Sequence, residues 1–357
     1  MIHFIQPAVP EYRVPFFEKI KEKYDIKIYT TKQDFLGVSS VKNLSYVDYN
    51  NKFINVFGKC LWMKNLPLFS AYKKGDVVVI NGNPRVLNYM LLFLILRIIG
   101  VKTVWWGHGW SAGSYGLLSK VRIKLMKIAN AVLVYTDKEK MKLNLPNCFA
   151  LNNGLDSKII KKSIFSSTSV RGPRESSFNL VFIGRITKKS NFEFLLHALS
   201  NCPEAVCLNV IGGCSDFKSV KKLSADLGLA HRINWLGPLY NEADIADVML
   251  RSHVFVYPGS IGLSLIHAFN YSLPAIIHNL DEYHMPEHYA FENKYNGLSY
   301  IKGSELDLVD KITSFSRMDE EEYNKFSQNA LNTVNHSFNV DDMVSRFEQL
   351  LESVSKW

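Results

Sequence analysis

The stretch FVYPGSIGLSLIHAFNYSLPAIIH, residues 255–278, contains a complete strand, turn, helix and second strand. Its opening run, Phe-Val-Tyr, has the aromatic and β-branched character of a buried strand. Pro258, Gly259 and Gly262 interrupt that run, and apolar residues then recur at helical spacing until Pro274. Because two parallel strands must be joined by such a crossover, the stretch predicts one βαβ unit of a parallel sheet.

The same alternation extends in both directions from this unit. Short apolar runs typical of strands alternate with longer amphipathic segments in both halves of the chain. We expect strands at 1–6, 25–31, 75–82, 102–109, 131–136, 148–154, 178–185, 206–213, 232–237, 253–259 and 274–278. We expect helices at 14–24, 89–99, 118–129, 192–201, 216–229, 242–252 and 263–272. The pattern predicts an α/β protein with two doubly wound, Rossmann-like domains and a ligand cleft between them.

The length of 357 residues fits two domains of about 150–180 residues each. Residues 163–177, SIFSSTSVRGPRESS, hold six serines, a glycine and a proline, which predicts a linker. The first domain would then cover 1–162 and the second 178–338. The remaining segment, 339–357, is expected to be a helix that packs back on the first domain. Its apolar residues on one face are Met343, Phe347, Leu350, Leu351 and Val354.

Composition is that of a globular protein, with 47% hydrophobic and 21% charged residues. The chain starts with MIHFIQPAVPEYR, which has no basic start followed by a long apolar core, so we expect a cytoplasmic protein without a signal peptide. The five cysteines lack the spacing of a zinc site, and we expect reduced thiols. The longest apolar run, 89–101, contains Arg97 and is shorter than the roughly 20 residues of a membrane span. It predicts a core or interfacial helix.

Charge is distributed unevenly along the chain. Residues 1–177 hold 27 Lys and Arg against 11 Asp and Glu, a balance of +16, and residues 178–357 hold 15 against 22, a balance of −7. A basic half favours an anionic substrate or an anionic lipid surface, although charge that serves solubility gives the same count. Nucleic acid is disfavoured as a partner because the charge is spread out and no nucleic-acid-binding motif is present.

The stretch VFIGRITKKSN, residues 181–191, combines a strand end with a basic turn. Gly184 would let a ligand approach the backbone, and Arg185, Lys188 and Lys189 would stand beside it. A planar guanidinium and a mobile ammonium together can neutralise a leaving nucleoside diphosphate. The alternative is a solvated basic turn.

The turn of the opening stretch can supply the complementary half of an anion site. Gly259, Ser260, Ile261, Gly262 and Leu263 lie where a strand ends and a helix begins, so their amides and the helix dipole would face a phosphate. An ordinary strand-to-helix connection is the alternative.

Taken in order, the motifs of 182–277 resemble the donor domain of the retaining glycosyltransferases of family 4, which have the GT-B fold. The motifs are FIGRITKKSNFEFLLHAL, LNVIGG, LSADLGLAHRINWLGPL and ADVMLRSHVFVYPGSIGLSLIHAFNYSLPAII. LNNGLDSKII, residues 151–160, resembles the Asn-Gly-hydrophobic-Asp hinge of that family. The resemblance covers most of 150–340.

The resemblance implies roles for individual residues and also two losses. Arg185 matches the diphosphate-binding arginine, whereas the partner lysine would fall at Ser190, so Lys188 or Lys189 would replace it. The two acids of the Glu-x7-Glu pair would fall at Gly259 and His267.

The resemblance also implies which residues would contact the ribose, the sugar and the base of the nucleotide-sugar donor. A ring nitrogen of His267 can bond a ribose hydroxyl, and a core histidine on a helix is the alternative. Glu287, after the strand at 274–278, is the proposed replacement acid for the sugar. Backbone near 235–240, including Leu239, would meet the base.

In the first half, His108 lies between two glycines after a strand, where the resemblance implies a contact with the donor sugar or the acceptor. A turn histidine without a ligand is the alternative. Trp105, Trp106 and Trp110 suit sugar faces, and the alternation along the strand predicts that one of the first two is core. Arg13 can meet an anionic acceptor, but a solvent-facing arginine is the expected state.

The resemblance and the charge together predict a retaining hexosyltransferase that needs no metal or other cofactor. It would move a sugar from a nucleotide-diphosphate sugar to an anionic lipid-linked glycan, as in lipopolysaccharide, O-antigen or capsule synthesis, at the inner face of the cell membrane. Two alternatives remain: a nucleotide-sugar epimerase of the same fold, and a non-catalytic partner subunit that binds nucleotide sugar or glycan.

Overall fold

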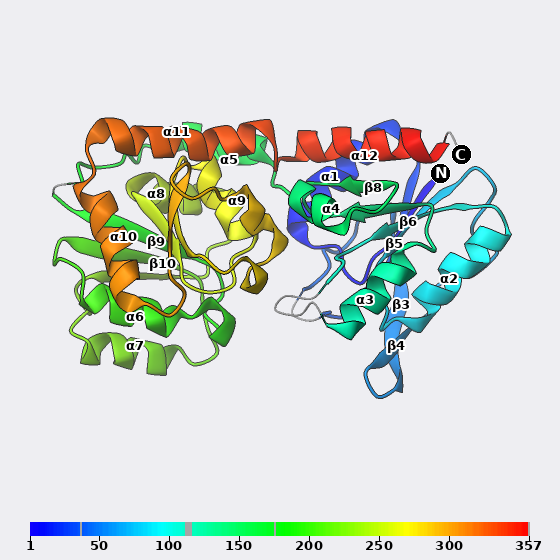
Figure 1. Cartoon of the computed structure of the whole chain (residues 1–357), viewed down its shortest axis with the longest axis horizontal. Helices are drawn as coiled ribbons and strands as arrows, with labels where there is room; N and C mark the ends of the chain where they lie inside the picture. The colour runs from blue at the N-terminus through cyan, green and yellow to red at the C-terminus, as the bar shows by residue number, and fades with distance from the viewer. Residues whose placement is uncertain (36–37, 111–115, 175, 356–357) are drawn as a thin grey trace. The chain divides into compact units, whose positions relative to one another are not determined.

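The computed structural model describes residues 1–35, 38–110, 116–174 and 176–355, and the chain forms two compact units (Figure 1). Unit 1 comprises Met1–Asn153 and Val340–Trp357, and unit 2 comprises Gly154–Asn339. Residue 175 of the predicted linker and the last two residues of the predicted C-terminal segment lie outside the described residues. The predicted α/β fold with two Rossmann-like domains is confirmed.

Unit 1 contains an eight-stranded sheet with the order β4-β3-β2-β1-β5-β6-β7-β8. Its strands are β1 (Ile2–Ile5), β2 (Ile26–Thr31), β3 (Val47–Phe57), β4 (Cys60–Lys64), β5 (Val77–Asn81), β6 (Lys102–Trp106), β7 (Ala131–Val134) and β8 (Cys148–Ala150). Its helices are η1 (Glu11–Arg13), α1 (Val14–Lys23), α2 (Leu87–Ile98), α3 (Leu117–Met126), α4 (Asp137–Leu143) and α12 (Val340–Ser355).

One edge of this sheet departs from the predicted parallel arrangement. β3 pairs in parallel with β2, but β4 turns back and pairs antiparallel with β3, so the sheet is mixed. Most residues of β3 are exposed or half-buried, so this hairpin lacks the apolar periodicity that identifies a strand in sequence. For that reason, the sequence pattern predicted neither β3 nor β4.

Unit 2 contains a six-stranded sheet, all parallel, with the order β11-β10-β9-β12-β13-β14. Its strands are β9 (Phe178–Ile183), β10 (Val206–Ile211), β11 (Ile233–Gly237), β12 (Val254–Tyr257), β13 (Ala275–His278) and β14 (Gly297–Tyr300). Its helices are α5 (Ser157–Ser166), η2 (Lys188–Ser190), α6 (Phe192–Ser200), α7 (Phe217–Asp226), α8 (Glu242–Arg251), α9 (Leu263–Asn270), η3 (Asp281–Tyr283), η4 (Pro286–Ala290), α10 (Glu305–Arg317) and α11 (Glu320–His336).

Alternate residues of β9 point to opposite faces of the unit 2 sheet, and each face carries its own core. Leu180 and Phe182 join the core formed with α6, α7 and α10. Val181 joins the core formed with α8, α9 and α11. Both faces are therefore covered by helices, which is why the strands appear in sequence as continuous apolar runs.

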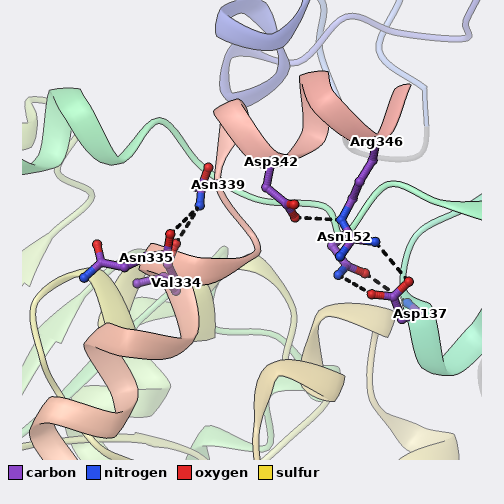
Figure 2. Close-up of polar contacts among 7 residues, drawn as sticks. All are labelled: Asp137, Asn152, Val334, Asn335, Asn339, Asp342 and Arg346. Carbon is purple, nitrogen blue, oxygen red and sulfur yellow. Dashed lines mark hydrogen bonds and ion pairs between the residues drawn. The ribbon is translucent and has the colours of Figure 1, made fainter. Parts of the chain in front are cut away.

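The chain passes between the units at two adjacent places. Leu155 forms a parallel bridge with Asn339, and a Cβ placed on Gly154 would lie 2.0 Å from the carbonyl carbon of Phe338. Asn339 donates to the carbonyls of Val334 (2.8 Å) and Asn335 (3.3 Å), the last turn of α11 (Figure 2). The boundary between the units thus lies at the Asn-Gly motif, between residues 153 and 154, rather than at 162 as the sequence predicted.

On the unit 1 side of the boundary, α12 is held by charged and apolar contacts. Arg346 bonds Asp342 within the helix and Asp137 at the start of α4, and Asp137 in turn accepts from Asn152 (Figure 2). The apolar face of α12 packs against β1 and α1, where Phe347 contacts the rings of Phe4 and Phe16.

The described residues of the predicted linker, 163–174 and 176–177, are part of unit 2. Residues 163–166 are the last turn of α5, and two arginines fasten the stretch that follows. Arg171 donates to the carbonyls of Ser252 and Tyr271, and the buried Arg174 donates to the carbonyl of Phe315. Serine, glycine and proline correctly indicate an irregular backbone, but these two side chains remove the freedom that a linker would have.

Candidate donor site

The first candidate site lies where the strand order of unit 2 reverses. β9 and β12 are neighbours at the centre of the sheet, and their crossovers proceed to opposite edges. Ligands of open α/β sheets bind beyond the carboxyl ends of the strands at such a switch point. β9 leads into Gly184 and Arg185, and β12 leads into Gly259, so topology alone places both predicted loops at this point.

The two loops are in direct contact. The amide of Ser260 donates to the carbonyl of Lys189 at 2.8 Å. A Cβ placed on Gly259 would lie 2.0 Å from the same carbonyl oxygen and 2.5 Å from the carbonyl carbon of Ser190. Only glycine fits at position 259 while the basic loop keeps this position. The packing of the two loops therefore excludes any side chain, including that of an acid, at position 259.

Ser190 has a structural role in the basic loop. It is buried, and its hydroxyl accepts from the amide of Thr187 (2.9 Å) and donates to the carbonyl of Thr187 (2.7 Å). Lys188 and Lys189 are exposed. A lysine at 190 could not occupy this buried position in the same way, and the two exposed lysines remain the predicted partners of a diphosphate.

Arg185 is also exposed, and it lies within electrostatic range of Tyr257 at the end of β12. Burial raises the pKa of the Tyr257 phenol, and the positive charge of Arg185 opposes that rise. Gly184 adopts φ +146°, and a Cβ there would lie 3.3 Å from the Tyr257 ring. The end of β12 therefore lies close to Gly184, and the approach of a ligand to this glycine stays a prediction.

The turn that precedes α9 uses two of the predicted amides for its own structure. The amide of Ser260 bonds Lys189, and the amide of Ile261 bonds Nδ1 of His284 at 3.3 Å. Gly262 is the N-cap of α9, where no side chain caps the helix. Within the described part of the chain, the amides of Gly262 and Leu263 have no hydrogen-bond partner, so they are available to an anion.

Two stacked histidines, His278 and His284, pack against this turn. His278 and His284 stack with ring centroids 3.8 Å apart, and Nε2 of His284 bonds the carbonyl of His278 at 2.9 Å. Burial lowers the pKa of His278 to about 4 and that of His284 to about 3, so both rings are neutral at pH 7. No group of three or more His, Cys, Asp or Glu side chains in the described ranges could hold a metal ion. The histidines shape the turn.

Glu287 lies against the same turn. It is buried in η4, and its Oε2 would be 3.7 Å from a Cβ placed on Gly262. This position is compatible with its predicted contact with the sugar, which stays a prediction. Leu239, the residue predicted to adjoin the base, is half-buried and packs against the core beneath α9.

His267 is tied to a carboxylate that sequence reasoning missed. Its Nε2 lies 2.7 Å from Oε1 of Glu242, the first residue of α8, and the hydroxyl of Tyr271 donates to the same oxygen. His267 is therefore neither a simple core histidine nor a free ring. In sequence, Glu242 shows only the signal of an acid in the first turn of a helix.

The candidate residues of unit 1 form a second cluster. Nδ1 of His108 lies 3.3 Å from Oε1 of Glu139, and the His108 ring is 4.2 Å from that of Tyr135. The buried Glu139 also accepts from the amides of Gly109 (3.2 Å) and Tyr135 (3.1 Å). Glu139 was missed because its spacing from Thr136 indicates only a helix cap, and the hydroxyl of Thr136 does cap α4 by accepting from the amide of Glu139. The Glu139 carboxylate holds the imidazole in one orientation.

Two expectations for unit 1 were wrong. Arg13 is buried rather than solvent-facing, and its guanidinium lies 4.5 Å from the centre of the Trp106 ring and 5.4 Å from that of Tyr135. Trp105 and Trp106 are both fully buried, because helices cover both faces of β6. Neither indole presents a face to a sugar, and Trp110 is half-buried.

The chain is similar to one protein-family model and to several solved structures. Residues 167–333 match the family model described as Glycosyl transferases group 1. HepE of Anabaena in complex with UDP aligns over 99% of both chains with a TM-score of 0.67 and 14% identity. The lipopolysaccharide outer core galactosyltransferase WaaB aligns over 99% of both with a TM-score of 0.69 and 15% identity. Sucrose-phosphate synthase of Thermosynechococcus elongatus aligns over 99% of both chains with a TM-score of 0.66 and 16% identity. No curated protein matches the chain by sequence.

At these identities the structural likeness concerns the fold, and it shows that the chain has the GT-B fold of glycosyltransferases. The family match adds that the segment carrying both contacting loops is similar to glycosyl transferases of group 1. Together they support a glycosyltransferase with the GT-B fold. Membership of family 4 and retention of configuration stay predictions.

Proposed function

We propose that this protein is a retaining hexosyltransferase that takes its sugar from a nucleotide-diphosphate sugar. One observation carries the proposal: the loop with Arg185 and Lys189 contacts the turn at Gly259 and Ser260 that leads into the uncapped start of α9, at the switch point of unit 2. A cationic loop and a helix N-terminus placed together favour the charge that develops on a departing diphosphate. HepE, which has the same fold, is known in complex with UDP-glucose, so a UDP-sugar is the first donor to test.

The division of roles within the donor site follows from chemistry. Arg185 and one of the two lysines would neutralise the diphosphate, and the free amides of Gly262 and Leu263 would bind one of its phosphates. Glu287 would accept a hydrogen bond from a sugar hydroxyl. A retaining transferase can pass the acceptor proton to the leaving phosphate oxygen, so the glycine at position 259 does not remove a necessary base. His108 is proposed to contact the sugar or the acceptor, and no residue here calls for a metal.

Binding of UDP, GDP and ADP, measured by calorimetry, tests the donor site. Arg185→Ala is expected to weaken the tightest of them by roughly 10- to 100-fold, the value of a hydrogen bond to a charged group. Arg317→Ala is the matched control, because Arg317 is equally exposed but ends α10 and so lies at the opposite edge of the sheet. Equal affinities for the two variants would contradict the proposal.

The acceptor is proposed to be an anionic lipid-linked glycan at the inner face of the cell membrane. No helix in the described ranges is long and apolar enough to cross a membrane. The end of α2 nevertheless exposes apolar side chains, of which Ile98 is 85% exposed. α3 carries the exposed residues Lys120 and Lys124, and the exposed Lys127 directly follows the helix. Arg97 of α2 bonds the carbonyl of Ile128 beyond α3. Apolar side chains beside cations suit an anionic lipid surface.

Sedimentation with vesicles of phosphatidylglycerol and phosphatidylcholine tests this surface. The protein is expected to bind at low salt and to be released at high salt, and Ile98→Glu should reduce binding without lowering the melting temperature. Met141→Glu, an exposed apolar residue on α4, is the control. No binding at low salt would refute the membrane part alone.

Turnover separates the proposed function from its alternatives. Transfer to a lipid-linked glycan is expected only when donor and acceptor are both present. Conversion of the nucleotide sugar in the absence of any acceptor would favour an epimerase. Binding without transfer or hydrolysis of the donor would favour a non-catalytic partner subunit.

A further inference from the structure

The carboxylate of Glu242, at the carboxyl edge of the unit 2 sheet, is held by hydrogen bonds to only one of its two oxygens. Oε1 of Glu242 accepts from Nε2 of His267 in α9 (2.7 Å) and from the hydroxyl of Tyr271, the residue that ends this helix (2.5 Å). Oε2 has no hydrogen-bond partner among the residues that the structure describes, and it is not among the fully enclosed polar atoms. The side chain keeps 23% of its surface exposed.

The environment keeps this carboxylate ionised. Burial alone would raise the pKa of Glu242, but the hydrogen bonds from His267 and Tyr271 and the charge of His267 lower it below its ordinary value. A half-buried carboxylate of this kind is a strong acceptor with one oxygen directed to solvent. If Glu242 served only to connect α8 with α9, its Oε2 would not need to remain exposed to solvent.

The position of Glu242 matches that of a ribose. α8 begins after β11 and α9 begins after β12, so both helix starts lie at the carboxyl edge of one parallel sheet. Leu239 precedes Glu242 by three residues in the loop between β11 and α8, and His267 follows the uncapped start of α9 by one turn. The carboxylate therefore lies along the edge that runs from the proposed base contact to the proposed phosphate contact.

We infer that Glu242 binds the ribose hydroxyls of the donor nucleotide, with His267 and Tyr271 as positioning residues. The inference rests on the proposed function. Vicinal hydroxyls are two adjacent donors, and an acid that accepts from them is the usual ribose contact of Rossmann-like domains. In this chain the acid comes from α8, and the histidine at the position of the second family acid orients it.

The test compares a ribonucleotide with its 2′-deoxy counterpart. Calorimetry would give dissociation constants for the tightest of UDP, GDP and ADP, and for the same nucleotide without the 2′-hydroxyl. The wild-type protein is expected to prefer the ribonucleotide by roughly 10- to 100-fold, as for a hydrogen bond to a charged group. Glu242→Ala should bind both forms with nearly equal affinity.

A matched pair elsewhere in unit 2 controls for the loss of a carboxylate. Glu204 also bonds a histidine, His231, but both are exposed and lie before β10 and β11, at the opposite edge of the sheet. Glu204→Ala should keep the full preference for ribose. Tyr271→Phe removes one positioning bond and retains the ring, so it should reduce the preference only in part, and it also serves if Glu242→Ala fails to fold.

The outcomes separate the inference from the function on which it rests. Nucleotide binding with an unchanged ribose preference in both Glu242→Ala and Tyr271→Phe would overturn the inference and leave the donor site intact. Absence of nucleotide binding by the wild-type protein would overturn both. A merely structural tie would lower the melting temperature of both variants and leave the ribose preference unchanged.

Discussion

Gly259→Ala is the most direct test of how the donor site is built. The new Cβ would lie 2.0 Å from the carbonyl oxygen of Lys189, so the basic loop or the turn must move. That movement breaks the 2.8 Å bond from Ser260 to Lys189, worth about 1 kcal/mol, and overpacking adds about 1–3 kcal/mol. We expect the free energy of unfolding to fall by about 2–4 kcal/mol.

Differential scanning fluorimetry would detect the change. For a domain of the size of unit 2, the expected loss lowers the melting temperature by roughly 4–16 °C. The control is Gly172→Ala in the same unit, because a Cβ there meets no atom within 4 Å and φ is not positive. Nucleotide affinity should fall with Gly259→Ala and not with Gly172→Ala. Equal melting temperatures for the two variants would refute the packing argument.

Three further substitutions or conditions follow from the described contacts. Glu139→Gln should lower kcat more than the affinity for the donor, because His108 loses its oriented partner while its ring remains; an unchanged kcat would refute that role. Stability should fall as pH drops from about 6.5 toward 4, because unfolded chains protonate His278 and His284 before the folded protein does; His284→Asn should flatten this slope in urea titrations at pH 7.5 and 5. Arg174→Met should cost about 1–3 kcal/mol of unfolding free energy by leaving a carbonyl of α10 without its buried donor, and the urea midpoint of the variant would show it.

The local pattern of the sequence was sufficient for the architecture of the donor unit. Each strand of unit 2 that the apolar runs predicted is present, because strands buried on both faces must be continuously apolar. The same rule failed at β3 and β4, whose exposed hairpin carries no such pattern. Composition likewise indicated an irregular segment at 163–177. It did not indicate that the segment is bonded to the rest of unit 2, because those bonds depend on which carbonyls lie near Arg171 and Arg174 in the fold.

What the sequence determined by itself is the βαβ order, and with it the two loops that contain Arg185 and Gly259, because topology alone brings the ends of β9 and β12 together. Only the tertiary structure decided how the acids are arranged. Glu242 and His267 are 25 residues apart, and Glu139 and His108 are 31 apart. Such pairs depend on the packing of one helix or loop against another, and that packing leaves no spacing in the sequence from which it could be predicted.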